Sequence, residues 1–287
     1  MDSSLRKSLL RLVDASLAHS FSWGTVCLDG VKSLAPSADT LGFHARSISD
    51  FDLIVKALDL FKGRPSNSVK PIHQCKFAFV KTDQFDSEAS DDLKVAWEQA
   101  KQVLSATGAG VGEVDLGQRY EGWMGPDGKF TDICAVEGAV TLQRECVVGG
   151  DKVGEGVREW FAKDITLESM LAARDELAIL KPDFDSIVSQ YDAIITPTVH
   201  NVAPVAGQGG GLPFFGSLWT GLGVPTVHMP GFAGESGMPM GLTLVGARYK
   251  DQDLLNVARV VAGSWIGADR GKLKRVPAPE GVVHLKP

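Results

Sequence analysis

The stretch from residue 76 to residue 116 most constrains what this chain can fold into. It begins with a short apolar run at 76–80, KFAFV, which predicts a buried strand. Apolar residues then recur with helical spacing over 91–107, and glycines end that pattern. A second apolar run at 111–116 predicts another strand. A strand, a helix and a strand with short connections predict two parallel strands joined by a right-handed crossover.

The rest of the chain also alternates between helical and strand patterns, which predicts an α/β fold with a mixed central sheet flanked by helices. No internal repeat and no clear linker divides the sequence, so one domain is expected. Pro182 is expected to break a long helical run, and 24–46 reads as a loop. The expected helices are 2–18, 51–61, 132–148, 151–180, 183–190, 214–222 and 252–263, and the expected strands are 193–196, 226–229 and 241–245.

Charge and composition narrow the class of protein. The net charge of -6 and the pI of about 5.5 argue against nucleic acid as the main partner, because phosphate binding needs a basic face. The four cysteines lie far apart without a C-x-x-C pair, which predicts reduced thiols and neither a metal site nor a cofactor. Charged residues interrupt the apolar N-terminal segment, and no window approaches a membrane span of about 20 apolar residues. We therefore expect a cytoplasmic protein that does not bind membranes.

Few side chains suggest chemistry by themselves. Thr196 and Thr198 follow a buried strand, and the carboxyl ends of strands face the ligand crevice in α/β sheets. These two hydroxyls either line a site there or cap the end of the strand. His44, beside the loop that contains Asp39, is a candidate for a pocket, whereas His228 lies inside a strand pattern and is expected to be a hydrogen-bonded core residue.

Two further motifs are weaker. Ser4 and Lys7 are three residues apart, and on a helix this spacing places a serine beside a lysine that can act as its base. An exposed terminal helix does not lower the pKa of a lysine, so a surface helix is the favoured interpretation. The glycines of 207–211 lack the strand, helix and Lys-Ser/Thr context of a phosphate-binding loop, and they predict a mobile loop.

Several segments between about Ser22 and Ser264 resemble, in the same order, those of the amidase signature family. They correspond to the loop after the nucleophile, a late core strand, the next helix and strand, a G-x-P-x-G-x-Q-x-x-G pattern and the last helix. Thr243 stands where the family usually has glutamine. The segments are 30–50 (GVKSLAPSADTLGFHARSISD), 192–198 (DAIITPT), 218–226 (LWTGLGVPT), 237–246 (GMPMGLTLVG) and 254–262.

The resemblance implies hydrolysis of carbon–nitrogen bonds in amides. The family's chemistry uses a lysine, a bridging serine and a nucleophilic serine, and backbone N–H groups hold the oxyanion. The nucleophile lies in a segment like G-G-S-[IV]-R-x-P-A, which this sequence lacks. Because 4–6 (SLR) stands at nearly the right distance before Trp23, Ser4 is the candidate remnant of the nucleophile. The candidate residues that line the pocket are Asp39, Thr40, Thr196, Thr198 and Trp219.

The resemblance also divides the chain. Residues 22–267 are expected to form an amidase-like α/β domain that lacks the N-terminal part of the family's fold, with an unmatched helix at 1–21 and a loose tail at 268–287. We expect an amide hydrolase homologue that takes small-molecule amides if active, but is inactive because the lysine and serine segment is absent or disrupted. The alternative is a non-catalytic module that binds a small molecule or a partner on this scaffold. A third hypothesis is an unrelated hydrolase that uses Ser4 and Lys7.

An incomplete sheet predicts a specific behaviour in solution. Without the strands of the N-terminal part, a sheet edge and apolar surface are exposed. We expect the chain alone to be poorly soluble, partly unfolded, or covered at this edge by a protein partner or a second copy. Light scattering after size exclusion, together with a thermal scan, tests this. A monodisperse monomer with a sharp cooperative transition would contradict the prediction.

Overall fold

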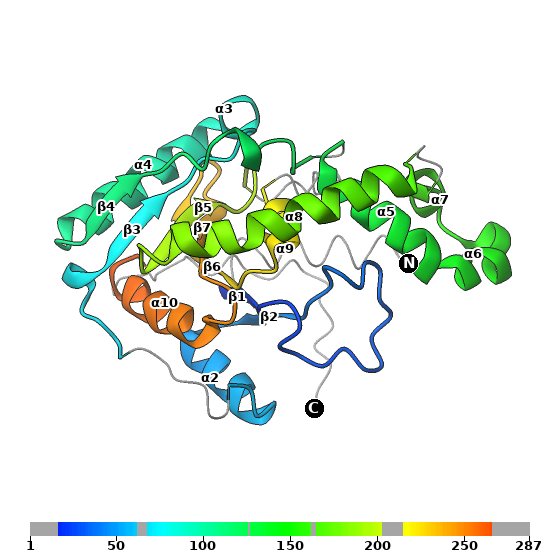
Figure 1. Ribbon diagram of the computed structural model, residues 1–287. Coiled ribbons are helices and arrows are strands. Elements are labelled where there is room, and N and C mark those ends of the chain that lie inside the picture. Colours follow the sequence, from blue (N-terminus) through cyan, green and yellow to red (C-terminus); the bar gives the residue numbers. More distant parts are fainter. Residues whose placement is uncertain (1–16, 62–67, 126, 162–164, 203–214, 266–287) are drawn as a thin grey trace.

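The computed structural model describes residues 17–61, 68–125, 127–161, 165–202 and 215–265, and these form a seven-stranded mixed sheet flanked by helices (Figure 1). The order across the sheet is β2-β1-β6-β7-β5-β3-β4. Strand β3 is parallel to both β4 and β5, and the other pairs are antiparallel. The strands are β1 (Leu17–Ser20), β2 (Gly42–Ala45), β3 (Lys76–Phe79), β4 (Gly110–Glu113), β5 (Ala193–Pro197), β6 (Thr226–Ala233) and β7 (Pro239–Val245).

The helices gather into two groups around this sheet. Helices α4 and α10 contact each other and pack on β6 and β7, while α5, α8 and α9 contact one another, with α8 crossing in front of the sheet in Figure 1. The helices are α2 (Ile48–Ala57), α3 (Phe85–Glu88), α4 (Asp91–Ala106), α5 (Lys129–Thr141), α6 (Gln143–Gly149), α7 (Glu155–Phe161), α8 (Leu167–Val188), α9 (Ser217–Leu222) and α10 (Asp251–Trp265). Short 3-10 turns occupy Ile72–Gln74, Gln118–Tyr120 and Gly150–Lys152. The predicted α/β class with a mixed sheet is confirmed.

The strand–helix–strand unit forms as predicted. The Ser90 hydroxyl caps α4 by accepting a hydrogen bond from the Leu93 N–H at 3.2 Å, and two acidic residues occupy the first turn. The apolar stripe of α4 then buries Leu93, Trp97 and Leu104 against the sheet. Strands β3 and β4, which α4 connects, pair directly with each other and are parallel. Local spacing was sufficient to predict this unit because its parts are neighbours in the sequence.

The prediction of a helix near the N-terminus is wrong for its last two residues. A helix was expected over 2–18, but Leu17–Ser20 form strand β1, which lies between β2 and β6. Burial alternates along β1, with Leu17 and His19 buried, as expected for a strand with neighbours on both sides. Strand β2 likewise occupies the end of the predicted loop 24–46. The sheet therefore includes residues that precede 22, and residues 1–16, with Ser4 and Lys7, lie outside the described part.

Helix α8 runs through Pro182, where the sequence predicted a break. Proline removes one backbone hydrogen bond from the helix, at a cost of about 3 kcal/mol in an exposed helix. Here Leu180, Phe184 and Val188, spaced four residues apart, are all buried on one face. Burial on both sides of Pro182 outweighs the lost bond. The predicted helix 132–148 is in fact divided at Leu142 into α5 and α6.

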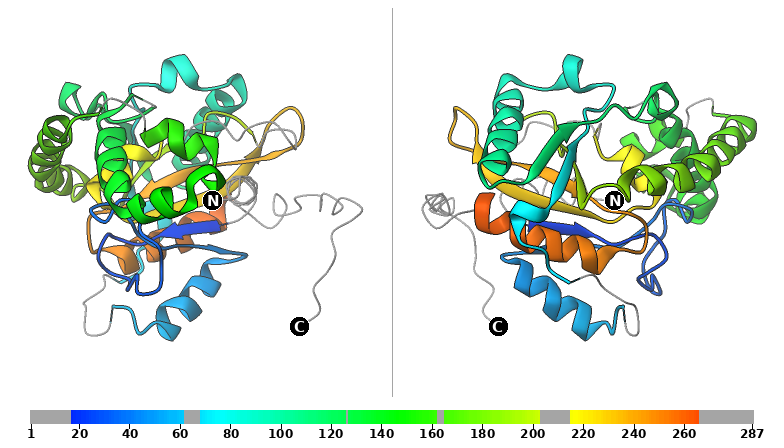
Figure 2. Two further views of the ribbon diagram at one scale, coloured as in Figure 1. Left: turned by 90° about the vertical axis from the view of Figure 1, so that its right-hand side faces the viewer. Right: turned by 60° about the vertical axis from the view of Figure 1, so that its left-hand side comes forward.

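Helix α2 is held on the outer side of α10, as both views in Figure 2 show. The Ser47 hydroxyl caps α2 by accepting from the Asp50 N–H at 3.3 Å. Nη2 of Arg259 in α10 donates to both carboxylate oxygens of Asp52, each at 2.8 Å, and this charge-assisted contact ties α2 to α10. Buried Phe51 packs near His19 of β1, so α2 also covers the end of the sheet that carries β1.

Gly241 marks the closest approach between β6 and β7. A Cβ atom at this position would collide with the carbonyl oxygen of Met229 and would lie 2.6 Å from Cε1 of His228. The first of these neighbours is backbone of the adjacent strand, so a rotamer change cannot relieve the collision. Only glycine keeps the two strands at this spacing.

We therefore expect Gly241→Ala to lower the free energy of unfolding by about 3 kcal/mol, because overpacking forces β6 and β7 apart. Gly112→Ala in β4 is the matched control, since no atom lies within 4 Å of its added methyl group. The control should change the free energy by less than about 1 kcal/mol. Urea denaturation of both variants measures the difference, and equal stability of the two would refute the role of Gly241.

Candidate active site

A cavity of about 330 Å³ lies where β1, β2 and β6 face helix α9 and the end of β5. Such a volume is at the small end of the range for ligand pockets. Among the described residues, its lining contains no lysine, arginine, aspartate or glutamate. The side chains that matter below are Ala18, Trp23, Thr40, Phe43, His44, Thr198, Phe215, Trp219, His228 and Thr243.

A polar row crosses the sheet beneath this cavity. Ala18 of β1 pairs with His44 of β2 on one side and with His228 of β6 on the other. His228 pairs in turn with Thr243 of β7, and Thr243 pairs with Thr196 of β5. Directly paired residues project from the same face of a sheet, so these side chains form one line across the strands. The line brings together positions from near both ends of the described chain.

Thr198 joins this row from just beyond the end of β5. Its Oγ1 lies 2.8 Å from Nδ1 of His228 and 2.7 Å from Oγ1 of Thr243. The carbonyl oxygen of Gly241 lies 3.4 Å from the same hydroxyl. Thr198 is only partly buried, whereas His228 and Thr243 are almost fully buried. Thr198 therefore presents this hydrogen-bonded group to the cavity.

The histidines near the cavity are neutral at pH 7. Burial, with a smaller contribution from nearby His44, lowers the pKa of His228 to about 3. Burial likewise lowers the pKa of His19 to about 4, which its hydrogen bond with the Thr226 carbonyl only partly offsets. The 3.9 Å approach of His19 to Asp251 is therefore not an ion pair at neutral pH. Partial burial lowers the pKa of His44 as well.

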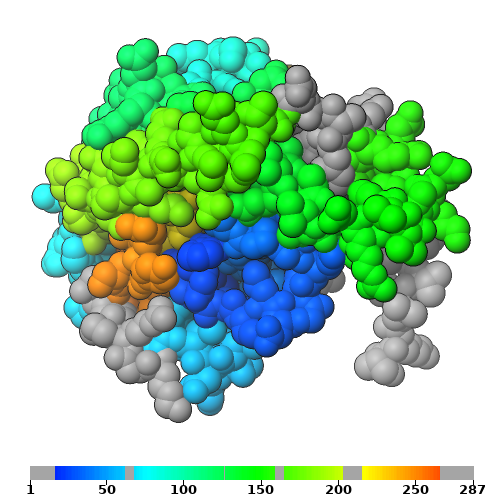
Figure 3. All heavy atoms as spheres, turned by 45° about the vertical axis from the view of Figure 1, so that its right-hand side comes forward, coloured from blue at the N-terminus to red at the C-terminus, as the bar shows by residue number. Residues whose placement is uncertain are grey.

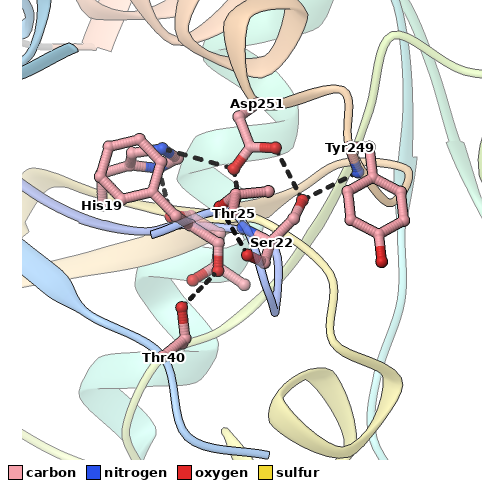
Figure 4. A network of polar contacts seen from close by, with 8 residues as sticks. His19, Ser22, Thr25, Thr40, Tyr249 and Asp251 are labelled. Atoms are coloured by element: carbon pink, nitrogen blue, oxygen red, sulfur yellow. Dashed lines mark hydrogen bonds and ion pairs between the residues drawn. The ribbon is translucent and has the colours of Figure 1, made fainter. Parts of the chain in front are cut away.

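A buried carboxylate fixes the end of β1, as Figure 4 shows. Asp251 is fully buried at the start of α10, and its two oxygens accept hydrogen bonds from the N–H and the hydroxyl of Ser22, each at 2.7 Å. The Tyr249 N–H donates to the same Ser22 hydroxyl at 2.9 Å. A carboxylate at a helix N-terminus is also favoured by the helix dipole. These bonds hold Trp23, the next residue along, at the cavity.

The segment after β1 folds back over the surface beside α8 (Figure 3). The Trp23 indole N–H donates to the Pro36 carbonyl at 3.1 Å, and Lys181 of α8 lies 5.9 Å from the centre of the Trp23 ring. Asp39 accepts from the Leu34 and Ala35 N–H groups at 2.8 and 3.1 Å. Asp39 thus shapes its own loop and does not line the cavity.

The residues proposed from the sequence divide into three groups. Thr40, Thr198 and Trp219 line the cavity, and Thr40 also donates to the Phe21 carbonyl at 3.0 Å. Asp39 and Thr196 do not line it, since Asp39 hydrogen bonds within its own loop and Thr196 of β5 is fully buried. Ser4 lies outside the described residues, as does the glycine segment 207–211.

The sequence alone did not indicate the part that His228 and Thr243 play in this cavity. His228 is a hydrogen-bonded buried residue as expected, but it also lines the cavity, as His44 does. A signal was present, because polar and apolar residues alternate over 226–229 (TVHM) and 241–244 (GLTL). Such alternation predicts one polar face on each strand. It does not say which residues of the two strands stand opposite each other.

Metal-binding clusters and membrane-spanning helices are both lacking in the described residues. No three histidine, cysteine, aspartate or glutamate side chains come together there in a way that would hold a metal ion. No helix in the same part of the chain combines the length and the apolar character needed to cross a bilayer.

The buried neutral histidines predict acid sensitivity. In the unfolded chain a histidine titrates near pH 6.5, whereas folded His19 and His228 stay neutral down to about pH 4 and about pH 3. Below pH 6.5 the unfolded state therefore binds more protons, and the free energy of unfolding falls as pH falls. Each histidine contributes up to about 1.4 kcal/mol per pH unit. We expect a slope of up to about 2.7 kcal/mol per unit between pH 6 and pH 5, since both contribute.

Denaturant unfolding at pH 7, 6 and 5 measures this slope. His19→Gln removes one of the two groups whose pKa is lowered most and should reduce the slope by up to about half. His73→Gln is the control, because His73 is exposed and should leave the slope unchanged. A stability that does not vary between pH 7 and pH 5 would be incompatible with neutral buried imidazoles.

Comparison with known proteins supports the resemblance. The chain is 23% identical over 285 residues to a glutamyl-tRNA(Gln) amidotransferase subunit of Agathobacter rectalis, covering 83% of this chain and 55% of that protein. The corresponding chloroplastic/mitochondrial protein of Arabidopsis thaliana is 22% identical over 292 residues, with 83% and 54% covered. A solved amidase structure superposes with a TM-score of 0.76 at 23% identity, covering 90% of this chain and 61% of that one. A fatty acid amide hydrolase gives 0.69 at 17% identity, with 91% and 54% covered.

These matches share one pattern of coverage. They take in most of this chain, yet the chain spans little more than half the length of the curated relatives it matches. The similarity to these solved structures, both below 25% identity, concerns the fold. The family model described as Amidase matches residues 22–255, which is most of the chain. The chain therefore belongs to the amidase family.

Proposed function

We propose that this chain is an amide hydrolase homologue whose cavity binds a small neutral amide, and that the 287-residue chain by itself does not cleave it. The observation that carries the proposal is the lining of the cavity. Hydroxyl groups, neutral imidazoles and aromatic rings line it together, without an ionised side chain among the described lining residues.

A neutral ligand suits such a lining. Burying a charged group without a partner of opposite charge costs several kcal/mol, so carboxylates and ammonium groups are disfavoured there. An amide is uncharged, and it offers both a carbonyl acceptor and, unless it is tertiary, an N–H donor. Thr198 is more accessible than His228 and Thr243, with which it is hydrogen-bonded, and its hydroxyl can hydrogen bond with either of these amide atoms.

The apolar part of the ligand would meet aromatic rings. Trp23, Phe43, Phe215 and Trp219 also line the cavity. Flat aromatic walls favour a ligand with an aryl or compact apolar group. Benzamide combines such a group with a primary amide and is small enough to serve as a probe.

The absence of cleavage is proposed from the chemistry that amide hydrolysis requires. Family enzymes need a lysine base and two serines, and a serine without its base keeps the low reactivity of a free hydroxyl. The sequence contains no G-G-S-x-R motif, and no lysine belongs to the described lining of the cavity. The lysine base that family enzymes use is therefore not supplied by the described lining.

A protein partner and a cytoplasmic location are also part of the proposal. Several relatives are named as amidotransferase subunits, which supports an assembly with another protein. Strand β2 lies at an edge of the described sheet, and an edge strand is a ready surface for pairing. All four cysteines are free thiols, and this supports a reducing compartment.

Titration with benzamide, followed by NMR, tests binding and cleavage in one sample. We expect benzamide to bind at least about tenfold more tightly than benzoate or benzylamine, because only the amide enters uncharged. We expect no benzoate to form during the titration. Thr198→Val should weaken benzamide binding about fivefold by removing one hydrogen bond.

Thr107→Val, at the end of α4 and away from the cavity, is the matched control and should bind benzamide as the wild type does. Equal affinity for benzamide and benzoate would refute the neutral site. Steady release of benzoate by the chain would refute the proposed lack of catalysis while leaving the binding site intact.

A further inference from the structure

The hydroxyl of Thr198 holds a central place in the polar group and has a single proton. It is in hydrogen-bonding distance of Nδ1 of His228 and Oγ1 of Thr243, and it lies 3.4 Å from the Gly241 carbonyl. A hydroxyl donates one hydrogen bond and accepts two. The acceptor to which Thr198 donates this proton therefore decides whether the hydroxyl can also donate a hydrogen bond to a ligand in the cavity.

The tautomer of the neutral His228 imidazole determines the direction of its hydrogen bond with Thr198. A neutral ring carries one proton, on Nδ1 or on Nε2. With the proton on Nε2, Nδ1 is an acceptor, so Thr198 must donate to it and can offer the cavity only a lone pair. With the proton on Nδ1, the ring donates to Thr198, and the hydroxyl proton of Thr198 is released for Thr243, for Gly241 or for a ligand.

Nothing in the described structure fixes the tautomer of His228. Its Nε2 is buried and has no hydrogen-bond partner among the described residues. Thr243 can either donate or accept, so it is compatible with both states. His19 provides the contrast, because its Nδ1 faces the carbonyl of Thr226, which can only accept. His19 is thereby held with its proton on Nδ1.

The surroundings of His228 leave both of its neutral tautomers possible. His44 stands across Ala18 in the same row and is the titratable group that affects His228 electrostatically. No carboxylate belongs to the described lining of the cavity, so no described lining residue stabilises a charged ring or accepts a hydrogen bond from one nitrogen as a carboxylate would. The ring thus exchanges one proton between two nitrogens without a change in net charge.

We infer that His228 is a positioning residue whose tautomer decides whether Thr198 can donate a hydrogen bond into the cavity, so that the cavity binds an amide by its carbonyl in one tautomer and by its N–H in either. This inference rests on the proposed function, because it specifies how the same cavity hydrogen bonds with the amide group of its ligand. Primary, secondary and tertiary amides would all be accepted, the last through the carbonyl alone.

The test follows the ring nitrogens of His228 by NMR in the ¹⁵N-histidine-labelled chain. N,N-dimethylbenzamide, which has only an acceptor, should shift the tautomer population towards the proton on Nδ1. Pyrrole, a neutral ring with only a donor, can bind a lone pair of Thr198 in either tautomer, so it should shift the population less than N,N-dimethylbenzamide does. Thr198→Val should abolish the response to N,N-dimethylbenzamide, Thr198→Ser should restore it, and Thr107→Val should respond as the wild type does.

A second variant decides the matter in the free protein. Thr243→Val leaves Thr198 with the Gly241 carbonyl as its remaining acceptor besides His228 among the described residues. We expect this to favour the proton on Nδ1, because that state alone makes two hydrogen bonds through Thr198. An unchanged tautomer population in Thr243→Val would overturn the inference.

The outcomes separate the inference from the proposed function. If both probes bind, as judged by shifts of the cavity resonances, but His228 keeps one tautomer throughout, the switch is refuted and amide binding stands. If neither benzamide nor the probes bind, the proposed function fails, and Thr243→Val still decides whether His228 and Thr198 share a mobile proton.

Discussion

The buried carboxylate of Asp251 is the interaction on which the arrangement of the sheet end depends. It accepts both polar hydrogens of Ser22, a residue 229 positions away, and so joins β1 to the start of α10. A buried charge without such partners costs several kcal/mol, so the two segments must come together for either to be stable. Once β1 is fixed between β2 and β6, the pairing register alone sets His44, Ala18, His228 and Thr243 in one line.

The parts of the fold that could be predicted are those determined by neighbours in the sequence. The unit 76–116 and the buried strand β5 were readable because apolar spacing and turn residues lie close together. Strand β1 was not, since its partners lie outside its own segment, in β2 and in the distant β6. Helix α8 was misjudged at Pro182 because burial of Leu180 and Phe184 is a tertiary effect.

The candidate site shows the same division. Family resemblance indicated Thr40, Thr198 and Trp219, which line the cavity, but it also indicated Asp39, whose carboxylate is occupied by its own loop. The hydrogen-bonded group around Thr198 depends on the opposition of His228 and Thr243 across two strands, which no local pattern encodes. Thr243 stands where the resemblance expects glutamine, so this chain keeps the family fold while having its own polar chemistry at the cavity floor.

Ala18 has a consequence for the size of ligand that this cavity admits. Its methyl group is the smallest side chain in the row, and it stands between two imidazoles on the strand that forms the floor. A longer side chain at this point would rise from the floor into the space above it and would separate His44 from His228. The small side chain of Ala18 therefore leaves room between the two histidines, and a residue that makes no hydrogen bond through its side chain contributes to the size of ligand that can enter.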